Sequence, residues 1–332
     1  MDYMLDLLEK GDIDLFHLDG KTIVIEDYLE IRPQNENRLK KLIENGKLFI
    51  GPWYVSPDEF LVSGEALIRN LLLGHKISYK YGSPMKVGYV PDQFGHISQL
   101  PQIFKGFDID NAILFRGITS DQVNSNFIWV GADGSKIFTE KLSDDVAYSN
   151  FFYKLRETLS DMGSIDYDIL DKEINNLIEE RKPHLIDNNI LGMDGVDHIY
   201  PNPKTTKIIK WINENKENIK AISTSLPEYI KRTKERIISE DNSREKELNS
   251  VKGELRFSNR KWKLQALLTG VLSSRIYLKQ QNNKLQNLLE KKVEPFSTLA
   301  WIKGEKKYPE AFIWKSWKYL LKNQPHDSIC GC

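Results

Sequence analysis

The sequence predicts an α/β fold in which a parallel-sheet, barrel-like catalytic domain is followed by a helical bundle. Up to about residue 225, short apolar runs alternate with stretches of helical periodicity. Strands separated by helices pair in parallel, because each helix returns the chain to the same end of the sheet. From about residue 226, apolar residues recur every three or four positions over long stretches, which is typical of packed helices. We therefore expect a catalytic domain at residues 1–225, a connecting segment at 226–255 and a three-helix domain at 256–332.

The individual elements follow from these two patterns. Apolar runs predict strands at residues 21–31, 47–53, 86–90, 111–115 and 188–193. Amphipathic patterns predict helices at residues 1–11, 36–46, 64–82, 98–107 and near 165–181. The turn residues Asp133-Gly134 predict a hairpin at 127–138. Long periodic stretches predict the helices of the second domain at residues 261–296 and 311–324. The charged stretch 231–247 is expected on solvated surface rather than in a binding site.

Composition narrows the class of protein. The chain has 332 residues, and its 47 basic and 47 acidic side chains give a formal net charge of zero. This balance argues against nucleic acid or an anionic membrane as the main partner. No apolar run reaches the roughly 18 residues that span a bilayer, and the start lacks the pattern of a signal peptide. Cys330 and Cys332 form neither a disulfide framework nor a four-ligand zinc motif. We expect a cytoplasmic protein, which could form a homo-oligomer.

Carboxylates follow two of the predicted strands. Asp92 comes directly after Pro91, which ends the strand 86–90, and Asp194 and Asp197 follow the strand 188–193. In α/β folds the carboxyl ends of parallel strands gather catalytic groups on one rim. A pair of carboxylates facing one cleft is the minimum equipment for glycoside hydrolysis. The alternative is that these aspartates only cap the turns or helices that follow them.

His326 is a further candidate, since Pro325 ends the helix 311–324 and leaves His326 at its terminus. A lone histidine is more often structural than a ligand. The same holds for the other histidines, His17, His75, His96, His184 and His198.

Five blocks together resemble a known family. They are GPWYVSPDEFLVSGEALIRNLLLGHK, VGYVPDQFGHISQLPQIFKGF, GMDGVDH, LLTGVLSSRIYLKQ and LLKNQPHDSICG. In this order they resemble bacterial α-mannosidases of glycoside hydrolase family thirty-eight, over essentially the whole chain. The resemblance implies a retaining exo-α-mannosidase with Zn2+ in its active site. Its substrate would be a mannose-containing oligosaccharide or a small α-mannoside.

The resemblance also implies roles for single residues. Asp92 matches the family's nucleophile, which is also a zinc ligand, and His326 matches a second zinc ligand. Asp197 matches the acid/base residue, with Asp194 as the alternative. Arg116 matches an arginine that touches the substrate, and Phe94 matches an aromatic residue near the sugar. In that chemistry Asp92 would attack C1 of mannose while Asp197 protonates the leaving oxygen.

The chain departs from the family pattern in two places. It has no H-x-H-W-D block, whose histidine and aspartate complete the family's zinc site, and it lacks the family's C-terminal β domains. We therefore expect a fragment with weak zinc binding and little activity. One alternative is a catalytically inactive fragment that keeps the fold. Another is a metal-dependent hydrolase similar to carbohydrate deacetylases, although two carboxylates plus a histidine fit glycosyl transfer better.

Overall fold

The computed structural model describes residues 1–157, 165–238, 248–258 and 266–331. Helices and strands alternate along the first 252 residues and helices follow, which confirms the α/β class. The strands are β1 (Phe16–His17), β2 (Leu48–Phe49), β3 (Gly88–Val90), β4 (Asn111–Leu114), β5 (Asn126–Val130), β6 (Lys136–Lys141) and β7 (Asn249–Lys252). The α-helices up to the last strand are α1 (Asp2–Lys10), α2 (Ile23–Ile31), α3 (Glu36–Glu44), α4 (Gly64–Tyr81), α5 (Leu100–Lys105), α6 (Tyr167–Arg181), α7 (Lys204–Asn215) and α8 (Leu226–Ile237). Beyond it come α9 (Ile276–Leu288), α10 (Glu294–Ile302), α11 (Glu310–Leu321) and α12 (His326–Cys330).

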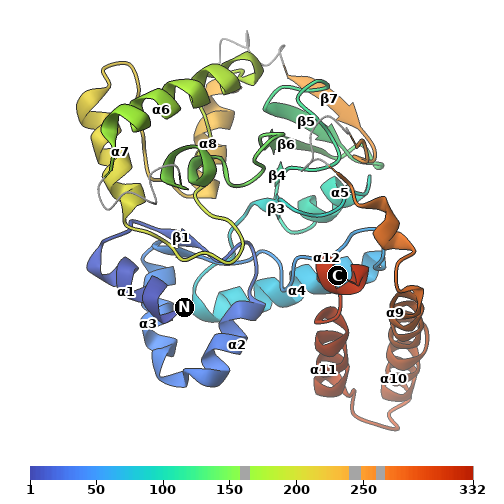
Figure 1. Cartoon of the computed structure of the whole chain (residues 1–332). Helices are drawn as coiled ribbons and strands as arrows, with labels where there is room; N and C mark the ends of the chain where they lie inside the picture. Colours follow the sequence, from blue (N-terminus) through green and yellow to red (C-terminus); the bar gives the residue numbers. More distant parts are fainter. Residues whose placement is uncertain (158–164, 239–247, 259–265, 332) are drawn as a thin grey trace.

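The described strands form two sheets (Figure 1). β1 and β2 pair in parallel, and the larger sheet has the order β3-β4-β6-β5-β7. β3, β4 and β6 run parallel, but β5 and β6 form the predicted antiparallel hairpin, with Gly134 at φ 88° in its turn. The sheet is therefore mixed rather than wholly parallel, and the strands described do not close into one parallel barrel.

Two predicted strands are wrong. The apolar run at 21–31 forms helix α2, because Ile25 and Tyr28 pack on one helical face against α1 and α3. The run at 188–193 is irregular. Its backbone is held by Asn150, whose side-chain amide donates to Leu191 O at 2.8 Å and whose Oδ1 accepts from Met193 N at 2.7 Å.

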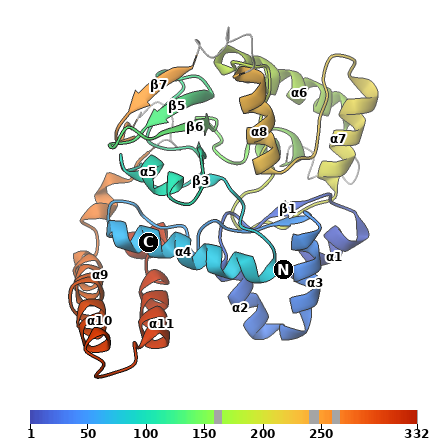
Figure 2. The ribbon, with the colours of Figure 1, turned by 180° about the vertical axis from the view of Figure 1, so that it is seen from behind.

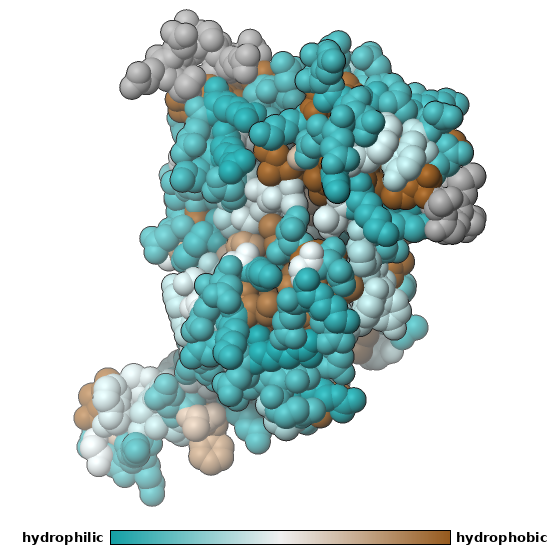
Figure 3. Space-filling view, turned by 90° about the vertical axis from the view of Figure 1, so that its left-hand side faces the viewer, coloured by the Kyte–Doolittle hydropathy of each residue, from teal (hydrophilic) through white to brown (hydrophobic). Residues whose placement is uncertain are grey.

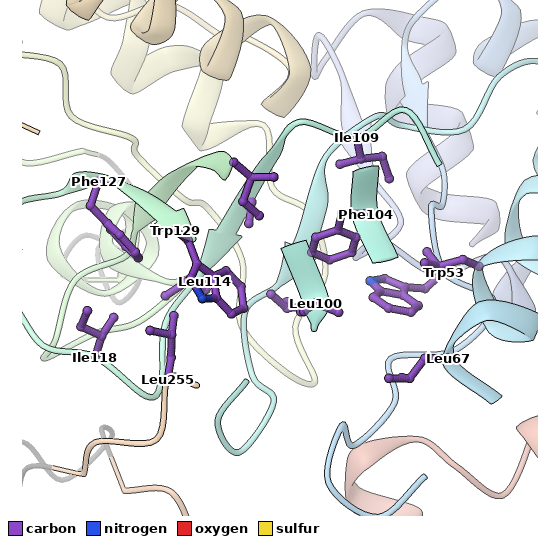
Figure 4. Packing of buried hydrophobic residues seen from close by; sticks show 14 of the residues in the cluster. Trp53, Leu67, Leu100, Phe104, Ile109, Leu114, Ile118, Phe127, Trp129 and Leu255 are labelled. Carbon is purple, nitrogen blue, oxygen red and sulfur yellow. The ribbon is translucent and has the colours of Figure 1, made fainter. Parts of the chain in front are cut away.

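Helices cover both faces of the larger sheet (Figures 1 and 2). On one face, Trp53, Leu100 and Phe104 pack with Trp129 and Leu114 of the sheet, together with residues of α4 (Figure 4). On the other face, α8 contributes Leu226, Tyr229, Ile230 and Ile237 to a cluster with Ile113 and Phe138. Within the stretch predicted as a connecting segment, α8 thus packs against the sheet and β7 is one of its strands.

The last helices form a hairpin that projects from the rest of the molecule (Figure 1). α9 continues through the π-helical residues Leu289–Val293 into α10, and α11 returns beside them. Ile313 and Trp317 of α11 pack with residues of α4, and the short α12 brings the chain back to the main body. The described part of this region thus holds two long helical segments and one short helix. No helix within the described ranges is both long and apolar enough to cross a membrane.

Helix α4 forms the base on which the site is built. Asn70 is buried, and its side chain accepts from Tyr54 N at 2.8 Å and Val55 N at 3.1 Å and donates to Val55 O at 3.0 Å. One turn further on, a Cβ added at Gly74 would lie 2.2 Å from Pro52 O. Residues 52–55 therefore lie directly against the helix backbone, and residues 56–63 continue from there to the site.

This close approach gives a matched pair of substitutions on one helix. Gly74→Ala should lower the free energy of unfolding by at least ~2 kcal/mol, since backbone must move to admit the methyl group. Gly64→Ala should change it by less than ~1 kcal/mol, toward higher stability, because that position has open space and alanine favours helix. Urea titration of both variants measures the difference, and equal effects would contradict the packing described for α4.

Candidate active site

Asp92 lies at the carboxyl end of β3, all three residues of which are buried. Pro91 ends the strand, and the loop that follows turns at Gly95, whose φ of 100° favours glycine. Gln93, which directly follows Asp92, is fully buried and donates to Ser56 Oγ at 2.8 Å. The Asp92 side chain, in contrast, is 25% exposed and borders a cavity. The loop is thus anchored beneath Asp92 while the carboxylate faces outward.

Arg116 reaches Asp92 from the neighbouring strand. It follows β4, which is parallel to β3, so both residues emerge at the same edge of the sheet. Its Nη2 and Nε donate to Asp92 Oδ1 at 2.8 and 3.1 Å, and Nη1 donates to Ala266 O at 2.6 Å. The guanidinium carbon also lies 5.6 Å from the centre of the Phe94 ring. The predicted substrate-contacting residue therefore pairs directly with the predicted nucleophile.

His326 approaches Asp92 from the other side, although 234 residues separate them. It is the first residue of α12, and its Nε2 lies 3.4 Å from Asp92 Oδ2. Its backbone N donates to Ser56 O at 2.9 Å, which fixes the helix start. The Phe94 ring lies edge-on to the imidazole, with centroids 5.4 Å apart. The structure thus brings together Asp92, Phe94, Arg116 and His326.

The surroundings of Asp92 and His326 favour the charged forms of both side chains. Burial by itself raises the pKa of Asp92, but the hydrogen bond with His326 and the charge of Arg116 outweigh burial and lower the pKa below its usual value. Burial lowers the pKa of His326, yet the hydrogen bond to Asp92 and the charge of Asp327 outweigh it and raise that pKa. Asp92 is therefore ionised at neutral pH.

Asp194 and Asp197 line the same cavity as Asp92, which has a volume of about 1160 Å³. Figure 3 shows this side of the molecule, with apolar side chains in a hollow between two more polar parts. Asp194 is engaged in an ion pair, since Arg156 Nε donates to its Oδ1 at 2.6 Å and Thr205 donates to its Oδ2. Asp197 is exposed in the irregular loop, with the Tyr148 hydroxyl 3.4 Å from its Oδ2.

Tyr148 is a cavity residue that the sequence patterns did not single out. Burial, followed by the negative charges of Asp92 and Asp197, raises its pKa, so the phenol stays protonated and can donate. Its place shortly after β6, a strand parallel to β4, was the available signal. Among the remaining histidines, His17 also borders the cavity. Its burial lowers its pKa to about 4, and its Nε2 accepts from Leu226 N at 3.1 Å, which marks it as structural.

The described residues supply only part of a zinc site. Asp92 Oδ2 and His326 Nε2 are donor atoms that zinc accepts, and they face each other. Zinc in proteins usually takes four ligands, three or more of them from protein side chains. Yet no group of three or more His, Cys, Asp or Glu residues suited to a metal exists among the residues described. This donor set does not complete a zinc site.

The ion pair predicts a pH-dependent effect of removing Asp92. The lowered pKa of Asp92 stabilises the fold above pH 3.8, and the raised pKa of His326 stabilises it below pH 6.5, so the pair contributes most between these values. Asp92→Asn should therefore lower the free energy of unfolding by ~1 kcal/mol more at pH 5.5 than at pH 9. Asp133→Asn, in the β5–β6 turn, should show no such difference. Denaturant titration at both pH values tests this, and a pH-independent effect of Asp92→Asn would contradict it.

Comparison with known proteins gives the family. Residues 1–252 match the family model "Glycosyl hydrolases family 38 N-terminal domain", and residues 266–332 match "Alpha mannosidase middle domain". A crystal structure of an alpha-mannosidase from Enterococcus faecalis V583 is 34% identical, with a TM-score of 0.86, over 100% of this chain and 36% of that one. A protein of Halalkalibacterium halodurans, whose name, mannosylglycerate hydrolase, is provisional, is 34% identical over 99% of this chain and 36% of its own. Alpha-mannosidase 2C1 of Mus musculus is 26% identical over 85% of this chain and 24% of its own.

The chain therefore spans about a third or less of the length of these relatives. Both matched regions nevertheless come from one family and follow one another along the chain. Because residues 1–252 match the family's N-terminal domain and relatives align with 99–100% of this chain, the chain belongs to glycosyl hydrolase family 38.

Proposed function

We propose that this chain carries the catalytic core of a retaining exo-α-mannosidase that acts on terminal α-mannosides, either oligosaccharides or small mannosides. The observation that carries the proposal is the position of Asp92. It is ionised, held between Arg116 and His326, and borders the same cavity as a second carboxylate, Asp197. A carboxylate nucleophile and a separate carboxylic acid are what retention requires.

The proposed reaction uses these two groups in two steps. Asp92 attacks C1 of the mannose ring while Asp197 gives its proton to the leaving oxygen, so that a glycosyl ester forms and the aglycone departs as an alcohol. Asp197, now ionised, then takes a proton from water, which attacks C1 and releases Asp92. Before the attack, the ion pair with Arg116 keeps Asp92 charged. When the glycosyl ester is hydrolysed, Asp92 becomes a carboxylate again and this ion pair is restored.

The surroundings of the two candidate acids favour Asp197 over Asp194. Both oxygens of Asp194 already have partners, since Oδ1 is paired with Arg156 and Oδ2 accepts from Thr205. Asp197 has only the neutral Tyr148 hydroxyl beside it among its described contacts. Tyr148 can therefore orient the Asp197 carboxyl group through a neutral contact.

Zinc is part of the proposal only in a restricted form. Asp92 and His326 are the residues that would hold it, and a bound zinc ion would serve as Lewis acid and template for the sugar hydroxyls. Two donors leave such a site incomplete, so this chain should bind zinc weakly. A catalytically inactive fragment that keeps the fold is the second candidate, and the incomplete donor set is the observation that favours it.

The proposal also includes the arrangement expected from the sequence. A barrel-like catalytic domain at residues 1–225 would be followed by a connecting segment at 226–255 and a three-helix middle domain at 256–332. The family models, which match residues 1–252 and 266–332, support a division between residues 252 and 266, at the end of this connecting segment and beyond it. A cytoplasmic location is likewise proposed.

The roles of the carboxylates can be separated by leaving-group dependence. In a hydrolytically active chain, Asp92→Asn should lower kcat on every aryl α-mannoside by at least ~10³-fold. Asp197→Asn should lower kcat/KM on poor leaving groups by ~10²–10⁴-fold and spare kcat/KM on the dinitrophenyl mannoside, because an activated leaving group needs no acid. Its kcat on that substrate should still fall, because the second step lacks its base, and added azide should restore it. Asp194→Asn is the matched control and should show neither the leaving-group pattern nor the azide response. If Asp194→Asn shows them instead, Asp194 is the acid and the proposed assignment is wrong.

The incomplete zinc site predicts that this chain binds zinc weakly. Zinc affinity, measured by competition with a chromophoric chelator, should rise at least ~10²-fold when a segment carrying H-x-H-W-D is joined before Met1, because two further ligands become available. Hydrolysis of an aryl α-mannoside with added zinc should rise in parallel. Equal affinities and equal rates for the two chains would show that the described donors suffice and that this account of the metal is wrong.

A further inference from the structure

Residues 56–63, which we call the bridging segment, contact both sides of the Asp92–His326 pair. On the side of the helical region, Ser56 O accepts from the backbone N of His326 at 2.9 Å. Two residues later, Asp58 N donates to Gln324 O at 3.2 Å, just before α12 begins. The bridging segment therefore holds the backbone at the start of α12 through these two hydrogen bonds.

The same segment holds the loop that carries Asp92. Glu59 Oε1 is bonded to His96 Nδ1 at 2.8 Å, and Glu59 Oε2 accepts from Ile97 N at 2.9 Å. One carboxylate thus ties down two consecutive residues of the loop. His96 is in turn paired with Leu255 through two backbone hydrogen bonds of 2.8 and 2.9 Å, which connects the loop to the segment beyond β7.

Glu59 and His96 are buried in the interior, where a polar side chain without hydrogen bonds would destabilise the fold. Both side chains are completely inaccessible to solvent, and neither lines the cavity. Burial raises the pKa of Glu59, although the charge of His96 and the hydrogen bonds from His96 and Ile97 oppose this. Trp129 packs edge-on against His96, with ring centroids 5.8 Å apart. A buried carboxylate that does not reach the cavity needs another role, and its bonds all go to the loop.

We propose that Glu59 is a positioning residue, which holds the Asp92 loop at its distance from His326 through His96 and Ile97. Phe94 lies on the loop between the anchor at Gln93–Ser56 and the anchor at Glu59, and Asp92 directly precedes the first of these anchors. Because His326 is bonded to the same segment, the bridging segment holds both Asp92 and His326 in position. The importance of this distance for catalysis rests on the proposed function, but the geometry itself does not.

Hydrogen–deuterium exchange of the full chain tests the proposal without requiring activity. Glu59→Ala should increase exchange at least tenfold in peptides covering residues 93–98, because Ile97 N loses its acceptor and the His96 side chain loses the partner that holds the loop in place. The matched control is Glu140→Ala in β6. Glu140 is equally buried and accepts from Asn126 and from the Tyr229 hydroxyl, so its removal should destabilise the fold without a selective increase at 93–98. Exchange is compared at denaturant concentrations that give the variants the same free energy of unfolding.

Glu59→Gln keeps an acceptor for Ile97 N, so its exchange at residues 93–98 should lie between that of wild type and that of Glu59→Ala. If Glu59→Ala does not fold, the comparison of Glu59→Gln with Glu140→Gln decides the matter, with a selective increase at 93–98 expected only for Glu59→Gln. Equal exchange at 93–98 in the Glu59 and Glu140 variants would overturn the proposal.

In a hydrolytically active chain, Glu59→Ala should in addition lower kcat at least tenfold with KM changed less than threefold. Absence of hydrolysis in every chain would count against the proposed function, while exchange would still decide the role of Glu59.

Discussion

The structure around the site depends on one charged contact, in which the Asp92 carboxylate lies between the Arg116 guanidinium and the His326 imidazole. Three parts of the chain supply these residues: the ends of β3 and β4, and the start of α12. A partly buried carboxylate would be costly alone, and here both of its oxygens have a partner. The contact therefore both keeps Asp92 ionised and joins the helical region to the sheet.

This contact is supported from below by a second layer of buried polar groups. Asn70 holds residues 54 and 55 against α4, and the bridging segment that follows carries Ser56 and Glu59 to the two sides of the site. The close approach of the backbone at Gly74 fixes the starting point of that segment. The precision of the site thus originates in the packing of α4, on which the loop that carries the carboxylate is anchored through the bridging segment.

The sequence located Asp92 well for a simple physical reason. A buried strand followed by proline must end there, and the next side chain emerges at the edge of the sheet. Arg116 was singled out through the family resemblance, and it follows the neighbouring parallel strand β4. His326 could be paired with Asp92 only through the family resemblance, since no periodicity predicts a contact across 234 residues. Local patterns failed where tertiary partners decide, as at 21–31, which packs as a helix, and at 188–193, where an asparagine side chain replaces a strand partner. Glu59 was missed because nothing in its local sequence distinguishes a buried acid from a surface one.

Mass spectrometry of a trapped intermediate tests the central claim, that Asp92 is the nucleophile, most directly. A hydrolytically active chain would be incubated with a fluorinated mannosyl fluoride, which forms the glycosyl ester but hydrolyses slowly, and then digested. The account predicts one added sugar on the peptide that contains Asp92, and no label after Asp92→Asn. A label on Asp194 or Asp197, or turnover with inversion and no labelled peptide, would contradict it.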